Sequence, residues 1–131
     1  AAVEAMRCSA GRLSAWLGPA IGPAVYEVGA EVRQAFLDQA DEAAQAFKAQ
    51  TNGRYLANLY LLARQRLKTL GVERVSGGDH CSASEPDRFY SYRRDGRTGR
   101  MASLIWIEPQ CAEATPPDFI EVSRLERYCL N

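Results

Sequence analysis

The sequence is poor in the residues that build a metal centre. It has 1 histidine, His80, and its 4 cysteines are spread along the chain without a close pair. A zinc site needs three or four ligands, and a zinc knuckle or redox pair needs closely spaced cysteines. We therefore expect no residue of this chain to be a metal ligand.

The chain also has no net charge, because 16 basic residues balance 16 acidic ones. This balance gives no support to a nucleic-acid partner or to attraction to a charged membrane surface. No apolar run approaches the length of a membrane-spanning helix, and no charged-then-apolar leader opens the chain. These absences predict no membrane partner, a cytoplasmic location and free thiols.

The first residues favour a helix but have no capping residue before them and no initiator methionine. A helix that begins on bare alanines is typical of one whose true start has been cut away. We therefore expect this chain to be a fragment of a longer protein, or one that begins after processing.

With 131 residues, of which 47% are hydrophobic, the chain has the size and composition of one globular domain. Short apolar runs predict strands at residues 13–17, 72–76 and 101–107. Apolar residues every three or four positions predict helices at residues 29–50, with a possible break at 38–41, and at 54–70, where Gly71 ends the helix. Together these elements predict an α+β fold in which one mixed β-sheet packs against two or three helices.

Unusual residues are concentrated at positions 76–107. Gly77-Gly78 precedes Asp79, His80 and Cys81, and the following Ser84-Glu85-Pro86 has the pattern of a helix start. Five arginines then occur within thirteen residues, interleaved with aromatic side chains: Arg88, Arg93, Arg94, Arg97 and Arg100. This is the stretch in which we look for a site.

The pattern GGD-x-C, followed by FYSYRRDG-x-TGRMASLIW, resembles the closing segment of the laccase-domain (multicopper polyphenol oxidase) family. An earlier block, WLGPAIGPAVYEVG, is similar to a second recognisable block of that family. The resemblance covers residues 1–107 and leaves residues 108–131 as an extension outside the family pattern. It implies that the sheet belongs to a larger α/β sandwich-like domain, so that this chain alone should show an exposed sheet edge and an apolar patch.

The resemblance further implies an enzyme that acts on purine nucleosides by phosphorolysis, with adenosine deamination as a possible further activity. Its implied partners are a purine nucleoside and phosphate, together with the missing N-terminal half or a second chain. It also implies zinc or copper, held by two histidines and a cysteine that precede the region seen here. The alternatives are laccase-like oxidation of polyphenols, a non-catalytic remnant that binds phosphate or a nucleotide, and an interaction protein.

Arg93 and Arg94 are the candidate phosphate-binding residues, because the planar guanidinium matches two phosphate oxygens at once. Tyr92 is a candidate to stack on a base or to donate a hydrogen bond. Asp79 is a candidate site residue. The alternative role of either arginine is architectural, to lock the fold through Asp79 or Asp95. Two alternatives remain for the arginine run. One is a solvated helix face, and the other is a nucleic-acid surface built from arginines and aromatics, which the neutral net charge disfavours.

Cys81 matches a family position, so a nucleophile must be considered. A reactive thiol needs a base or a positive field that lowers its pKa, and Arg93 or Arg94 would be the source of such a field. His80 is its direct neighbour, and adjacent side chains of an extended segment point to opposite faces. We favour a structural thiol beside a surface histidine.

Overall fold

The computed structural model describes residues 2–105 of the chain. The elements in chain order are α1 (Ala2–Ala5), the 3-10 helix η1 (Ala10–Arg12), β1 (Ser14–Leu17), β2 (Glu27–Val28), α2 (Ala30–Leu37), the 3-10 helix η2 (Asp41–Ala46), β3 (Phe47–Ala49), β4 (Tyr55–Ala57), α3 (Leu59–Thr69), β5 (Arg74–Gly77) and α4 (Tyr92–Asp95). This mixture of strands and helices confirms the α+β class. Within residues 2–105, no helix has the length and apolar character needed to cross a membrane.

The strands form two sheets instead of the single sheet that we expected. β1 and β5 are parallel, in a register that runs from Ser14 opposite Arg74 to Leu17 opposite Gly77. β4 lies between β2 and β3 and is antiparallel to both. The parallel pair joins segments about 60 residues apart in sequence, and it positions the loops described below.

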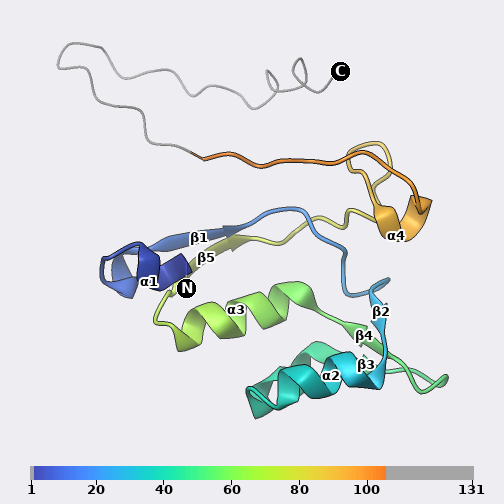
Figure 1. Ribbon diagram of the computed structural model, residues 1–131, viewed down its shortest axis with the longest axis horizontal. Helices are drawn as coiled ribbons and strands as arrows, with labels where there is room; N and C mark the ends of the chain where they lie inside the picture. The colour runs from blue at the N-terminus through green and yellow to red at the C-terminus, as the bar shows by residue number, and fades with distance from the viewer. Residues whose placement is uncertain (1, 106–131) are drawn as a thin grey trace, which may run out of the picture.

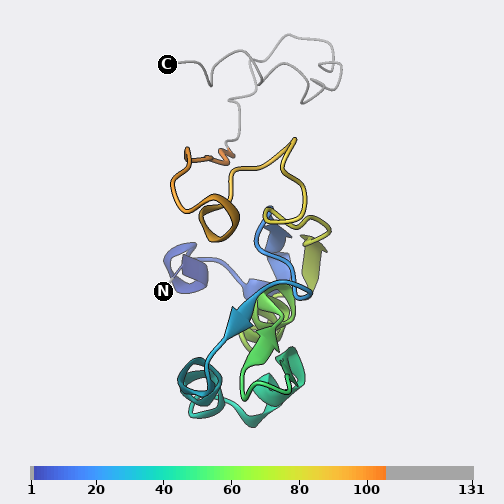
Figure 2. The same cartoon turned by 90° about the vertical axis from the view of Figure 1, so that its right-hand side faces the viewer.

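α3 lies between the parallel sheet and the helical layer formed by α2 and η2 (Figures 1 and 2). Its Arg64 guanidinium donates to the backbone carbonyls of Val75 and Gly77 in β5, at 3.0 and 2.6 Å. On its other side Leu62 is buried against Ala43 and Ala46 of η2. Burial of this apolar side chain, worth roughly 2 kcal/mol, holds the two layers together.

The two predicted helices are shorter than their apolar spacing indicated. The first ends at Leu37, and residues 41–46 form a 3-10 helix, so the break that we considered possible is present. The second begins at Leu59, because residues 55–57 pair as β4 and the Asn58 side chain accepts a hydrogen bond from Leu61 N–H at 3.0 Å. It ends as predicted, with Gly71 at a φ of 79°.

Two predicted elements are wrong in the described part of the chain. Residues 101–105 form no strand, and Trp106 and Ile107 lie outside the described residues. A strand needs a hydrogen-bonded partner, and none of the described strands pairs with this segment. The helix expected from Ser84 is instead a series of turns, and only residues 92–95 are helical.

Candidate functional site

The candidate site is built on two loops that follow the parallel strands, residues 18–22 and 78–85, here called the loop pair. They are joined by a bridge between Ala20 and Cys81 and by a hydrogen bond of 2.9 Å from Ser82 N–H to the Ala20 carbonyl. Both loops leave the carboxyl ends of their strands, which in parallel sheets is the end where ligands usually bind. The fold therefore places the sequence blocks that carried the family resemblance side by side.

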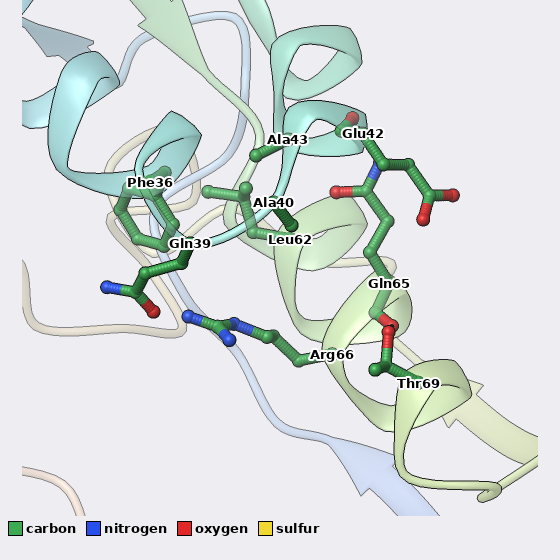
Figure 3. A pocket seen from close by; sticks show the side chains of 9 residues that line it. All are labelled: Phe36, Gln39, Ala40, Glu42, Ala43, Leu62, Gln65, Arg66 and Thr69. Carbon is green, nitrogen blue, oxygen red and sulfur yellow. Dashed lines mark hydrogen bonds between the residues drawn. The ribbon is translucent and has the colours of Figure 1, made fainter.

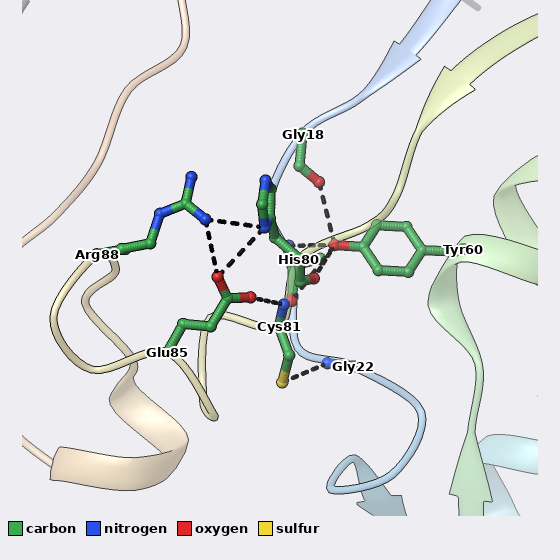
Figure 4. A network of polar contacts seen from close by, with 8 residues as sticks. Gly18, Gly22, Tyr60, His80, Cys81, Glu85 and Arg88 are labelled. Atoms are coloured by element: carbon green, nitrogen blue, oxygen red, sulfur yellow. Dashed lines mark hydrogen bonds and ion pairs between the residues drawn. The ribbon is translucent and has the colours of Figure 1, made fainter. Parts of the chain in front are cut away.

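Tyr60, in the first turn of α3, holds the loop pair together through its hydroxyl (Figure 4). The hydroxyl accepts from Ala20 N–H at 2.7 Å and donates to the His80 carbonyl at 2.6 Å. Gly78 makes this approach possible, since a Cβ there would lie 2.9 Å from the tyrosine ring, and its φ is 84°. We did not select Tyr60 from the sequence; a polar aromatic among leucines, which needs a partner for its hydroxyl, was the available signal.

Tyr60→Phe is expected to destabilise the protein by about 1–2 kcal/mol, because it removes both loop contacts while it keeps the ring. Chemical denaturation of the two proteins measures the difference. Tyr92→Phe is the matched control, because the Tyr92 side chain is 73% exposed and its change should have no effect. Equal stability of Tyr60→Phe and the parent protein would contradict this role for the hydroxyl.

Cys81 is a partly buried free thiol whose Sγ accepts from Gly22 N–H at 3.1 Å. Burial raises the pKa of Cys81, but hydrogen bonds from the Ser84 side chain and the Gly22 backbone outweigh it, so the pKa lies below its ordinary value. The charge of Arg93 or Arg94 is not a cause of this lower pKa, although the sequence pointed to these arginines as the source of a positive field. Gly22 is needed here, because a Cβ would lie 3.0 Å from the Cys81 Cβ.

Glu85 is a second residue that the sequence did not single out as part of the site. One carboxylate oxygen accepts from Cys81 N–H at 2.7 Å, and the other lies 3.2 Å from His80 Nδ1 and 3.1 Å from the Arg88 guanidinium (Figure 4). The hydrogen bond from Cys81, together with the neighbouring charges of His80 and Arg88, lowers the pKa of Glu85. His80 thus belongs to a surface charge cluster.

Arg94 joins α4 to the second loop of the loop pair and to the segment that follows it. Its guanidinium donates to the carbonyls of Ser82, Ala83 and Phe89 at 3.0, 3.3 and 3.1 Å. It also forms an ion pair of 2.7 Å with Asp95, which raises the pKa of Arg94 and lowers that of Asp95. Of the two pairings considered from the sequence, the structure therefore contains the one with Asp95.

Arg93 has different surroundings from its neighbour. It donates to the Glu27 carbonyl at 3.0 Å, and its guanidinium carbon lies 5.3 Å from the centre of the Tyr26 ring. These contacts attach α4 to β2. Tyr92 and Asp79 are both exposed, the first on α4 and the second at the start of the loop that contains Cys81.

The described residues do not fit a zinc or copper centre. No group of three or more His, Cys, Asp or Glu side chains gathers within residues 2–105 in a way that would hold a metal ion. In Figure 4 the His80 ring points toward Glu85 and Arg88, whereas the Cys81 sulfur points toward Gly22. The two potential ligands therefore diverge and cannot bind one metal ion together.

A small pocket lies elsewhere, between α2, η2 and α3 (Figure 3). Its volume is ≈ 70 Å³, and it is lined by Phe36, Gln39, Ala40, Glu42, Ala43, Leu62, Gln65, Arg66 and Thr69. Pockets for drug-sized ligands occupy about 300 Å³ or more, so this one is too small for a nucleoside. None of its lining residues belongs to the loop pair.

The chain is similar to several bacterial proteins named purine nucleoside phosphorylase. The YfiH protein of Shigella flexneri is 53% identical over 107 residues, which are 79% of this chain and 44% of that protein. A relative from Pseudomonas aeruginosa is 50% identical over 109 residues, 82% of this chain and 45% of its own length. This chain therefore spans less than half the length of these relatives.

The fold of this chain is also similar to that of solved bacterial structures. A Neisseria meningitidis protein assigned to the DUF152 family matches with a TM-score of 0.80 and 50% identity, over 82% of this chain and 44% of that one. A Bacillus licheniformis YfiH protein described as hypothetical matches with a TM-score of 0.66 and 26% identity, over 72% of this chain and 36% of its own. Residues 1–108 match the family described as multi-copper polyphenol oxidoreductase laccase. The chain belongs to this laccase family.

Proposed function

We propose that this chain is part of a purine nucleoside phosphorylase of the laccase family and that it contributes the phosphate-binding side of the active site. The names of relatives 50–57% identical to it support the activity. In phosphorolysis a phosphate oxygen attacks C1′ of the ribose, the bond from C1′ to the base breaks, and the base leaves with the bonding electrons. The reaction needs a group that holds the phosphate anion close to the sugar.

Arg93 is the phosphate ligand in this proposal, and its surroundings are the observation that carries the choice. A guanidinium has five N–H donors, and within the described residues Arg93 uses one of them, on the Glu27 carbonyl. Arg94, by contrast, uses its donors on three carbonyls and on Asp95. Binding phosphate through Arg94 would require those contacts to break, whereas Arg93 can bind without that loss.

Tyr92 and Asp79 serve as contacts to the nucleoside, because both are exposed and lie on the segments next to Arg93 and Cys81. The Cys81 thiol is structural, since its sulfur is used to hold Gly22 and thus the first loop. The zinc or copper implied by the family is assigned to residues outside this sequence, and the enzyme is placed in the cytoplasm. Laccase-like oxidation of phenols is the second candidate, favoured by the description of the matched family.

Arg93→Ala tests the proposed phosphate site. Titration calorimetry of this chain with inorganic phosphate should show binding that weakens roughly tenfold in the variant, because a charge-assisted fork is lost. Arg97→Ala is the matched control, an arginine of the same run that is expected to leave binding unchanged. Phosphate binding that is unaffected by Arg93→Ala, or reduced equally by Arg97→Ala, would contradict the assignment.

A further inference from the structure

The ring of Tyr26 lies against the guanidinium of Arg93. The guanidinium carbon lies over the ring, 5.3 Å from its centre. At this distance the negative face of an aromatic ring attracts a cation. Arg93 is part of α4, whereas Tyr26 directly precedes β2, so the contact joins segments that are far apart in the sequence.

The contacts of Arg93 leave most of its hydrogen-bond donors available. Of the five N–H donors of a guanidinium, the Glu27 carbonyl accepts one, at 3.0 Å, within the described residues. The Tyr26 ring contacts the guanidinium carbon through its face and not through an oxygen acceptor. Ring and carbonyl therefore hold the guanidinium at two points while the remaining donors stay open to an anion.

The acidic side chain next to this contact is held elsewhere. One carboxylate oxygen of Glu27 pairs with Arg54 at 2.9 Å, and the other accepts from the Asn52 amide at 3.1 Å. A carboxylate on Arg93 would compete with phosphate for the same donors. Arg93 thus keeps its charge available to an anion, although an acidic residue lies beside it.

The backbone of Tyr26 is fixed at both of its polar groups. Its N–H donates to the Gly22 carbonyl at 3.1 Å, and its carbonyl accepts from Ala57 N–H at 2.9 Å. Gly22 is buried and donates in turn to the Cys81 sulfur at 3.1 Å. Tyr26 is therefore attached to the loop pair on one side and to β4 on the other, which gives its ring a defined place.

We propose that Tyr26 is a positioning residue of the phosphate site, whose ring holds the Arg93 guanidinium in the orientation that phosphate binding requires. The inference rests on the proposed function, because it takes Arg93 as the phosphate ligand. A mobile arginine side chain loses rotational freedom when it binds an anion, and this loss weakens binding. An arginine that a ring already holds loses less freedom, so phosphate binds to it more tightly.

Tyr26→Leu removes the aromatic face and keeps an apolar side chain. Titration calorimetry of the full chain with inorganic phosphate should show binding weakened about fivefold in this variant. Tyr26→Phe keeps the ring and should restore the affinity. In a chain that already carries Arg93→Ala, Tyr26→Leu should weaken binding no further, because the side chain that Tyr26 positions is gone.

Tyr55→Leu is the matched control for the loss of a ring. The guanidinium carbon of Arg33 lies over the Tyr55 ring, 5.1 Å from its centre, so this change removes an equivalent contact at another place. It should leave phosphate binding unchanged. Circular dichroism of both leucine variants verifies that each is folded.

A further variant separates the attraction between ring and cation from simple packing. Pentafluorophenylalanine at position 26 has nearly the shape of phenylalanine, but the charge on the face of its ring is reversed. If the ring attracts the guanidinium, this variant should bind phosphate as weakly as Tyr26→Leu does. If the ring only fills space, it should bind as tightly as Tyr26→Phe. The comparison decides the proposal even if Tyr26→Leu does not fold.

The outcomes distinguish the role of Tyr26 from the phosphate site itself. Phosphate binding that Arg93→Ala leaves intact would overturn both. Binding that Arg93→Ala weakens, but that the fluorinated ring leaves at the level of Tyr26→Phe, would overturn the role of Tyr26 alone. An equal loss of binding in Tyr55→Leu and Tyr26→Leu would have the same meaning.

Discussion

Gly77→Ala is expected to destabilise the protein by about 3 kcal/mol or more, one of the two largest effects of a single substitution predicted for this chain. The residue has a φ of 74°, which alone costs an L-amino acid roughly 1–2 kcal/mol. A Cβ would also collide with the carbonyl oxygen of Leu17 and approach the Trp16 ring nitrogen to 2.8 Å. Because the Leu17 oxygen belongs to the backbone, this clash can be relieved only by separating β1 from β5.

Gly53→Ala is the matched control for this change. Gly53 has nearly the same φ, 75°, but a Cβ there would meet nothing within 4 Å. Its substitution should therefore cost about 1 kcal/mol, the conformational part alone. Urea denaturation of both variants gives the two free energies of unfolding. If they were equal, the contact between the strand ends would contribute nothing to stability.

Arg94→Ala is expected to lower the thermal unfolding midpoint by several degrees, the second large effect. The substitution leaves the carbonyls of Ser82, Ala83 and Phe89 without their donor and Asp95 without its ion-pair partner. These contacts link α4 to the second loop of the loop pair, through Ser82 and Ala83, and to Phe89 beyond it. Differential scanning calorimetry of the variant and the parent protein measures the change.

Two further variants separate the geometry of Arg94 from its charge. Arg94→Lys keeps the charge but lacks the planar fork, so it should remain close to the alanine variant in stability. Arg93→Ala, one residue away, should change the midpoint much less, because Arg93 makes a single backbone hydrogen bond. A larger loss for Arg93→Ala than for Arg94→Ala would reverse the roles assigned to the two arginines.

The sequence by itself determined the features that depend on neighbouring residues. The apolar runs identified β1 and β5, and Gly71 marked the end of α3, because strand alternation and a left-handed helix end are set locally. It also determined the family, since the two motif blocks are continuous in sequence and need no structure to be seen.

Only the tertiary structure decided which side chains hold the site. Tyr60 reaches Ala20 and His80 across 40 and 20 residues, and no local pattern encodes such a partner. The same holds for Arg64, because no neighbouring residue in the sequence indicates that its guanidinium binds the carbonyls of β5. The predicted strand at residues 101–107 shows the reverse case: its apolar residues favour a strand, but a strand forms only beside a partner, and in residues 2–105 none lies against it. Local chemistry sets the preference of a segment, and distant contacts decide whether that preference is realised.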